Sequence, residues 1–186
     1  MPFTPTTFPG LIVIEPAVIE DSRGYFFEAY NEKHFNNNHI HETFLQDNQS
    51  RSTYGVVRGL HYQRPPYAQT KLVRVISGAI LDTVLDLRTG SPTYGETFSI
   101  ELSADNKKQL LIPKGFAHGF AVISEIAEVL YKCDAYYNRE SESGINYNDP
   151  QLKLDWKIPA DKIIVSEKDK LLPLFNQYNG EFTFVQ

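Results

Sequence analysis

Two short stretches carry most of the side chains in this sequence that could do chemistry. In the first, residues 55–71, a histidine (His61) is followed by a lysine (Lys71) at the far end. A neutral imidazole near a cation can act as a general base, because the positive charge disfavours a charged ring and can hold an anion as it forms. A surface loop rich in solvated charge is the alternative, and the spacing alone does not decide between the two.

The second stretch, residues 112–120, contains His118 in the pattern PxGxxH. It resembles the second half-motif of the cupin superfamily, small barrels made from two Greek keys, and residues 55–61 resemble the first half-motif. A metal-binding cupin presents His-x-His and then a glutamate, whereas here His61 is followed by Tyr and Gln, with Lys71 downstream. A divalent ion needs about three protein ligands and is repelled by an ammonium. We therefore expect no metal and no other cofactor.

The elements that must position these residues are short strands. The chain has 11 Tyr and 12 Phe, and its 11 Gly and 11 Pro are scattered along it. Turn signals recur about every 8–12 residues, which is typical of a sandwich or barrel. We expect strands at residues 11–15, 25–30, 43–46, 56–63, 70–77, 79–87, 97–102, 109–112, 120–123 and 127–133.

The connections between these strands also carry signals. Pro65-Pro66 cannot continue a helix or a central strand, so residues 64–69 are expected to form a loop. Ser77-Gly78 predicts a hairpin between its flanking strands. Residues 31–41 are expected to hold a helical turn, and residues 161–169 a loop with a short strand or turn.

Length and composition limit the classes of protein to which the chain can belong. The 186 residues, 41% hydrophobic and 22% charged, suit one soluble domain over residues 1–186. The net charge of −5 disfavours a general nucleic-acid binder. Cys133 is the one cysteine of the sequence, so no internal disulfide can form. No apolar run approaches the roughly 20 residues needed to span a bilayer, and the first residues lack the pattern of a signal peptide. We expect a cytoplasmic protein with no membrane partner.

Several blocks in order resemble the dTDP-4-dehydrorhamnose 3,5-epimerase family. They are DSRGYFFE at 21–28, FLQDN at 44–48, VRGLHYQ at 57–63, KLVRV at 71–75, IPKGFAHGF at 112–120 and LYK at 130–132. The resemblance runs from about residue 8 to Pro173 and implies a mainly β fold, the cupin double-stranded β-helix or jelly-roll barrel, with a few short helices. The tail at 175–186 lies beyond the family pattern and is expected to be an extra strand, a disordered end or a dimer contact.

The resemblance implies catalytic roles for a small set of residues. The family's substrate is a 6-deoxy-4-keto hexose on a dTDP handle, and each epimerisation moves a proton next to the ketone, at carbon 3 or carbon 5. This chemistry needs a base, an acid across the ring and a donor for the enolate oxygen. By resemblance, His61 is the base, Tyr131 the acid, Lys71 the donor, and Asp169 the carboxylate that orients His61. The pattern alone favours a core position for Tyr131 and an exposed one for Asp169.

A second set is implied for substrate binding. Guanidinium and ammonium groups suit a diphosphate, and a tyrosine face suits thymine. By resemblance the binding residues are Arg23, Glu28, Gln46, Asn48, Arg58, His118, Tyr137 (stacking on thymine), Glu142 and Lys168. Arg23 and Glu28 are expected to reach across from a partner subunit, which implies a homodimer. Asp82 and Asp86 have no assigned role, and we expect one of them to pair with Lys71 or His118.

Three alternatives stay open at this stage. One is a related epimerase that acts at carbon 3 or carbon 5 alone, which would use the same base and acid. Another is a 4-ketosugar isomerase of the same fold, although those chains are typically shorter at the C-terminus. The third is a non-catalytic cupin that only binds a nucleotide sugar, for which the loss of His61, Lys71 and Tyr131 would be expected.

Overall fold

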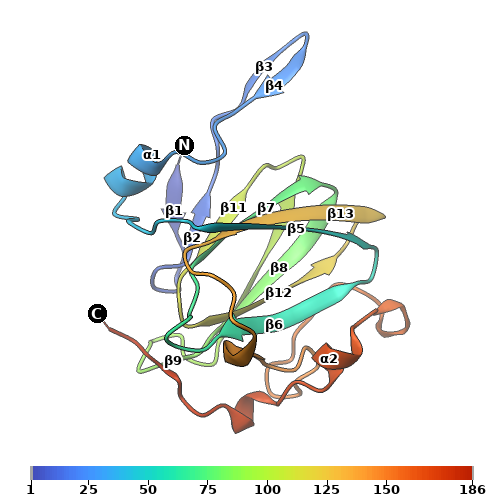
Figure 1. The fold of residues 1–186 in the computed structure, drawn as a ribbon. Coiled ribbons are helices and arrows are strands. Elements are labelled where there is room, and N and C mark those ends of the chain that lie inside the picture. Colours follow the sequence, from blue (N-terminus) through green and yellow to red (C-terminus); the bar gives the residue numbers. More distant parts are fainter. Residues whose placement is uncertain (1, 186) are drawn as a thin grey trace.

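The computed structural model describes residues 2–185, in which two antiparallel sheets face each other (Figure 1). The larger sheet contains, in spatial order, β1 (Phe3–Pro5), β2 (Ile12–Ile14), β11 (Gln109–Ile112), β7 (Lys71–Ser77), β13 (Ile126–Cys133) and β5 (Gln46–Thr53). The smaller sheet contains β10 (Thr97–Ser103), β8 (Ala79–Asp86), β12 (Phe116–Val122), β6 (Val57–Gln63) and β14 (Glu142–Gly144). From β5 to β8 the chain alternates between the sheets, as it does again from β10 to β13. The predicted mainly β cupin barrel is confirmed.

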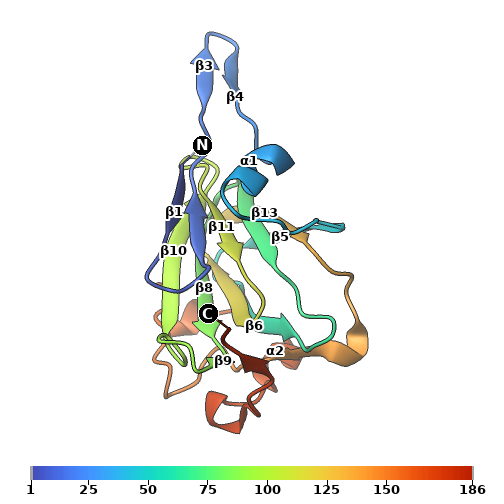
Figure 2. The ribbon, with the colours of Figure 1, turned by 90° about the vertical axis from the view of Figure 1, so that its left-hand side faces the viewer.

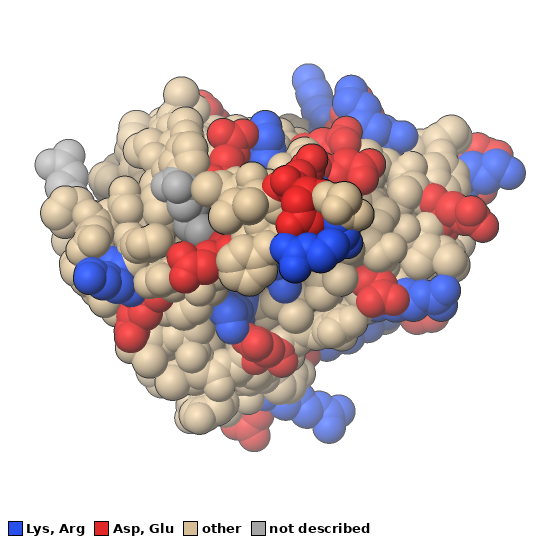
Figure 3. All heavy atoms as spheres, turned by 90° about the horizontal axis from the view of Figure 1, so that it is seen from above, with Lys and Arg blue, Asp and Glu red and all other residues tan. Residues whose placement is uncertain are grey.

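Smaller elements complete the chain. A hairpin of β3 (Ile19–Asp21) and β4 (Gly24–Phe26) projects beyond the ends of both sheets (Figures 1 and 2). The short helices are α1 (Glu32–Asn37), α2 (Glu167–Lys170) and 3₁₀ turns at Arg139–Ser141, Ala160–Lys162 and Phe175–Gln177. Asn31 caps α1 by accepting from two backbone N–H groups. Seen from above, acidic and basic side chains are interspersed (Figure 3), as expected from 23 acidic and 18 basic residues.

The apolar residues form three clusters. The largest lies between the sheets and includes Val73, Val84 and Phe120. A second lies on the outer side of the smaller sheet, where the C-terminal segment covers it with Trp156 and Phe182. A third lies between α1 and the outer side of the larger sheet. The two smaller clusters thus cover part of each sheet's outer face, and the largest fills part of the space between the sheets.

Three local expectations were wrong. Strands β7 and β8 do not form a hairpin with each other: each pairs inside its own sheet, and at Gly78 (φ +75°) the chain turns from one sheet to the other. The strand expected at 43–46 begins at Gln46 and runs to Thr53. The strand expected at 25–30 ends at Phe26. The stretch at 161–169, expected to be a loop with a short strand or turn, contains a 3₁₀ turn, an isolated β-bridge at Ile164 and the start of the helical turn α2, as predicted.

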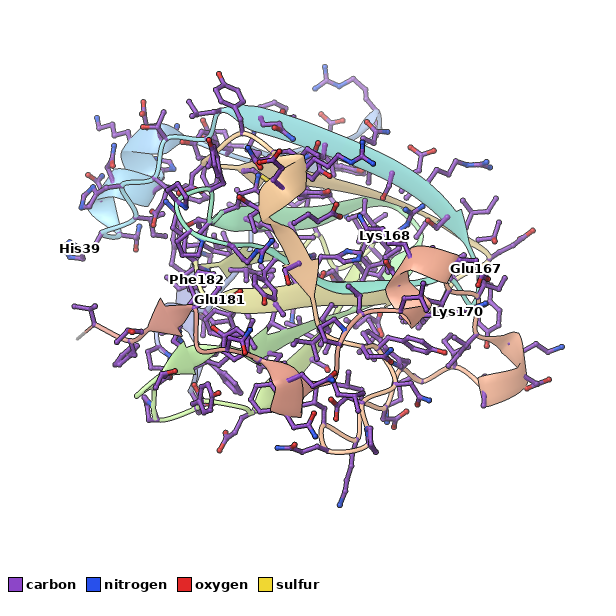
Figure 4. The ribbon with its side chains drawn as sticks, turned by 60° about the horizontal axis from the view of Figure 1, so that its bottom comes forward. His39, Glu167, Lys168, Lys170, Glu181 and Phe182 are labelled. Carbon is purple, nitrogen blue, oxygen red and sulfur yellow. The ribbon has the colours of Figure 1, made fainter. Side chains whose placement is uncertain are left out.

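The C-terminal tail is ordered through residue 185. Strand β15 (Phe182–Thr183) pairs in parallel with β9 (Arg88–Thr89), and the Tyr62 hydroxyl donates to Glu181 at 2.7 Å. Figure 4 shows Glu181 and Phe182 together on the underside of the barrel, well separated from α2. The tail therefore contains a short strand, which is one of the three possibilities expected for it. Gln186 lies outside the described residues.

Candidate functional site

A polar cavity of about 330 Å³ lies between the two sheets. Both sheets contribute to its wall, with β5, β7 and β13 on one side and β6 and β12 on the other. Its lining residues are Gln46, Asn48, Ser50, Arg58, His61, Tyr62, Gln63, Gln69, Lys71, His118, Gly119, Phe120, Tyr131, Tyr137 and Glu142. The cavity therefore gathers most of the side chains that the sequence singled out.

His61, on β6, is held by a buried carboxylate from α2. Its Nε2 donates to Oδ1 of Asp169 at 2.8 Å, and the other carboxylate oxygen accepts from the backbone N–H of Gly59 at 3.1 Å. The Asp169 side chain is 7% exposed and the imidazole 31%. Burial alone would raise the pKa of Asp169, but the hydrogen bonds from His61, Gly59 and Ser166 hold that pKa below its usual range. The exposed position that the pattern favoured for Asp169 is thus wrong.

The strand that carries His61 lies unusually close to β12, which carries His118. At Gly59 (φ +113°) a Cβ atom would lie 2.7 Å from Cα of Gly119, and at Gly119 a Cβ atom would lie 2.6 Å from the carbonyl oxygen of Arg58. Only glycine at both positions allows this approach. The register between the two strands shifts next to the contact, between His118 and Phe120.

Lys71 and Tyr131 reach the cavity from the opposite sheet. They lie on the neighbouring strands β7 and β13, on the faces that point toward β6. Burial lowers the pKa of Lys71, while the nearby Cys133, Asp82 and Glu142 act against that shift. Burial and Cys133 raise the pKa of Tyr131, and the charge of Arg58 partly opposes them. The net effect favours the protonated form of the phenol.

The two unassigned aspartates of β8 have separate partners. Asp82 accepts from Nε2 of His118 at 2.9 Å, which confirms the expectation that one of them pairs with His118 or Lys71. Asp86 accepts from Arg88 at 2.7 Å and also from Ser91 and Thr93. Asp86 therefore belongs to a structural ion pair outside the cavity.

The rim of the cavity carries polar side chains in a connected set. Oε2 of Glu142 accepts from the Tyr137 hydroxyl at 2.8 Å and from the Lys168 ammonium at 2.5 Å. The backbone N–H of Tyr137 donates to the Gln46 side chain, which in turn donates to Asn48. This set joins β5, β14 and α2, the helix on which Figure 4 labels Lys168.

Two predicted binding residues neither line the cavity of their own chain nor pair with a residue that lines it, whereas Lys168 pairs with the lining residue Glu142. Arg23 lies on the projecting β3–β4 hairpin, where its side chain is 88% exposed and pairs with Asp21. Glu28 follows the hairpin and accepts from Asn31 at 2.9 Å. Neither residue lines the cavity, so a site containing them would have to draw on a second copy of the chain.

Several lining residues had no place in the sequence interpretation. Ser50 lies on the same strand face as Asn48, and Gln63 on the same face as His61. The two-residue period of a strand is the signal that could have found both. Gln69 donates to the carbonyl oxygen of Ala135 across a loop, and no local signal predicts that contact.

Two further kinds of feature are absent from residues 2–185. Among these residues, no group of three or more His, Cys, Asp and Glu side chains is arranged to hold a metal ion. No helix within the same range is long and apolar enough to cross a membrane.

Facing sheets with a polar cavity between them define the cupin class of small barrels. Within that class, the chain belongs to the dTDP-4-dehydrorhamnose 3,5-epimerase family, because the model of that family matches residues 5–177.

The relatives agree with this assignment. The chain is 50% identical over 171 residues to a dTDP-4-dehydrorhamnose 3,5-epimerase of Pseudomonas aeruginosa, covering 91% of this chain and 93% of the relative. A crystal structure of the enzyme from Elizabethkingia anophelis superposes with a TM-score of 0.91 at 48% identity, over 96% of this chain and 98% of the other. A dTDP-6-deoxy-D-glucose-3,5-epimerase from Legionella pneumophila, in complex with dTDP-4-keto-L-rhamnose, gives a TM-score of 0.93 at 43% identity, over 100% and 98% of the two chains.

Proposed function

We propose that this protein converts dTDP-4-dehydro-6-deoxy-D-glucose to dTDP-4-dehydro-L-rhamnose by inverting carbons 3 and 5 through enolate intermediates. The observation that carries the proposal is the placement of His61 and Tyr131 on opposite walls of one cavity. Inversion requires removal of a proton from one face of the sugar and delivery to the other face, so a base and an acid must flank the ring. The match to a family named for this reaction points the same way.

In this account His61 takes the proton next to the ketone. The hydrogen bond to Asp169 fixes which ring nitrogen carries the proton and leaves the other nitrogen available as the base. The ammonium of Lys71 holds the oxygen on which negative charge develops. Tyr131 then delivers a proton from the far side. Each of these contributions is expected to be worth about 10²–10⁴-fold in rate.

The nucleotide handle would occupy the rim. Arg58 and Lys168 supply positive charge for the diphosphate, and the Tyr137 ring, half exposed at the rim, offers a flat face for thymine. Gln46, Asn48, Glu142 and His118 provide the polar partners for the remaining groups. We also propose a homodimer, in which Arg23 and Glu28 of one subunit complete the cavity of the other. The projecting hairpin supports this, because Tyr25 and Phe26 are 58% and 68% exposed on it.

The same proposal includes metal-independent catalysis by a cytoplasmic enzyme. The proton transfers need no Lewis acid when an ammonium faces the enolate oxygen. Activity should therefore survive EDTA, and elemental analysis should find no stoichiometric zinc, iron or manganese. Loss of activity on chelation, restored by one of these metals, would contradict this part of the proposal.

The direct test is turnover of dTDP-4-dehydro-6-deoxy-D-glucose, followed by NMR of the sugar ring. We expect inversion at both carbons by the wild-type protein and none by His61→Asn, while the variant still folds and binds dTDP. Inversion at one carbon would support the single-carbon epimerase. Migration of the keto group along the ring without inversion would support the 4-ketosugar isomerase. Binding without any turnover would support the non-catalytic cupin.

A further inference from the structure

Arg58, which lines the cavity, is held by a buried serine of the facing sheet. Its Nε and Nη2 atoms both donate to Oγ of Ser52, at 3.1 Å each. Arg58 lies on β6 in the smaller sheet, and Ser52 lies on β5 in the larger sheet and is 7% exposed. Ser52 does not line the cavity itself. The contact therefore joins the two sheets beside the cavity, with the arginine on the cavity side.

Both residues lie on the inner faces of their strands. Three residues line the cavity at every second position of β5, namely Gln46, Asn48 and Ser50. Ser52 is the next residue on that face, because side chains alternate along a strand. On β6, Arg58 and His61 are three residues apart but pair with Phe120 and His118, which are two apart. This irregularity brings both β6 side chains to the cavity, whereas a regular strand would place them on opposite faces.

The partner of Arg58 is neutral, whereas two other arginines use the same atoms on a carboxylate. Arg88 donates through Nε and Nη2 to Asp86, and Arg23 through the same two atoms to Asp21. None of the ion pairs within residues 2–185 includes Arg58. A hydroxyl oxygen can accept two hydrogen bonds without carrying a charge. The serine therefore fixes the guanidinium and leaves its positive charge uncompensated.

The guanidinium of Arg58 also keeps free donors. Of its five N–H groups two donate to Ser52, which leaves three, on Nη1 and Nη2. These two nitrogens form one edge of the guanidinium, and such an edge suits a bidentate contact with a phosphate. Because the Nε side is occupied, an anion in the cavity would meet Arg58 through its Nη1–Nη2 edge.

We propose that Ser52 is a positioning residue that holds the Arg58 guanidinium at the cavity without neutralising it, so that the Nη1–Nη2 edge binds the diphosphate of the substrate. The inference deepens the proposed function and rests on it for the identity of the anion. A long side chain that is held in place before binding loses less rotamer entropy when the ligand arrives. Ser52 thus strengthens binding without touching the ligand.

The test compares the affinity for dTDP with that for thymidine, which lacks the diphosphate, both by isothermal titration calorimetry. Ser52→Ala should weaken dTDP binding by about 10-fold, as expected for lost hydrogen bonds to a charged group, and leave thymidine binding unchanged. Ser52→Thr keeps the hydroxyl and should restore the affinity for dTDP. Ser103→Ala is the matched control, because Ser103 is 5% exposed and lies outside the cavity.

A double-mutant cycle separates positioning from a merely structural role. In protein that already carries Arg58→Ala, Ser52→Ala should not change the affinity for dTDP further, because the side chain that it positions is gone. Equal losses with and without Arg58 would overturn the inference, and so would an unchanged dTDP affinity in folded Ser52→Ala. An unchanged affinity in Arg58→Ala alone would remove Arg58 from the proposed function, and this inference with it.

Two further measurements cover the case in which Ser52→Ala does not fold. Ser52→Asp would still hold Nε and Nη2 but would compensate the charge of Arg58, so we expect it to bind dTDP more weakly than wild type does. Equal or tighter binding by this variant would overturn the inference. In the wild-type protein, the Nε–H of Arg58, assigned by its loss in Arg58→Lys, should exchange slowly with water in ¹⁵N NMR. The fast exchange of a fully solvated guanidinium would contradict the proposal.

Discussion

Asp169 reaches His61 from 108 residues further along the chain and holds its Nε2 at 2.8 Å from a carboxylate oxygen. The same carboxylate is fixed from behind by the N–H of Gly59, on the strand that carries the histidine. Both carboxylate oxygens of Asp169 are therefore fixed by hydrogen bonds. The imidazole of His61 is held in one orientation, with its other nitrogen toward the cavity.

The first prediction concerns this pair. Asp169→Asn should lower kcat by about 10²–10⁴-fold, because the amide can hold the ring in the wrong tautomer. Circular dichroism and dTDP binding should stay close to wild type. Glu167→Gln is the matched control, since Glu167 lies on the same helix with its side chain 87% exposed. Equal kcat values for Asp169→Asn and the control would remove Asp169 from its role.

A second prediction uses pH. Because the pKa of Asp169 is lowered in the folded protein, the stabilisation it provides is fully present above the usual range of a carboxyl group. It is lost as the pH falls through the lowered pKa. The difference in unfolding free energy between wild type and Asp169→Asn should therefore stay constant from neutral pH to about pH 5 and shrink below it. Urea denaturation at a series of pH values measures it, and a difference that does not change with pH would contradict the assignment.

The third prediction separates the acid from the base. Tyr131→Phe removes the phenol but leaves His61 and Lys71 able to form the enolate. We expect inversion to slow by about 10²-fold or more, while exchange of the substrate's protons with solvent slows less. His61 can still return a proton to the face from which it came. NMR in D₂O gives both rates, and an unchanged ratio of exchange to inversion would leave Tyr131 as a packing residue.

A fourth prediction tests the shared site. Arg23→Ala and His61→Asn should each be inactive. In the proposed dimer, each cavity takes His61 from one subunit and Arg23 from the other, so a dimer of the two variants has one intact cavity. If subunits exchange, an equal mixture should recover about a quarter of wild-type activity, since half of the dimers carry one intact site of two. No recovery after proven subunit exchange would place both residues in the same site. Arg51→Ala is a control, because Arg51 is exposed and lies outside the cavity.

The sequence predicted some strands of this fold correctly and misplaced others. Strands with apolar alternation, such as β7 and β13, were recognisable because their inner faces pack in the core. Strand β5 (QDNQSRST) has no apolar residue, since one face lines the cavity and the other faces outward, so its position was misjudged. The aromatic run at 25–30 has strand propensity, yet only Tyr25 and Phe26 fall within a strand of this chain.

The sequence also predicted the residues of the site only in part. His61, Lys71 and His118 stand out locally, in motifs that a single stretch can reveal. The contact of Asp169 with His61, and the burial of Asp82 beneath His118, depend on pairing between distant strands and on the path of the C-terminal segment. Local patterns carry no information about such contacts. For Asp169, only the resemblance to the family outweighed a pattern that favoured exposure.

We expect this cavity to remove and return protons at two carbons of the sugar. The most direct measurement incubates the wild-type protein with dTDP-4-dehydro-6-deoxy-D-glucose in D₂O and locates deuterium on the ring by NMR and mass spectrometry. We expect deuterium at carbons 3 and 5 with the wild-type protein and at neither carbon with His61→Asn. A wild-type protein that binds the substrate and introduces deuterium at neither carbon would contradict the account.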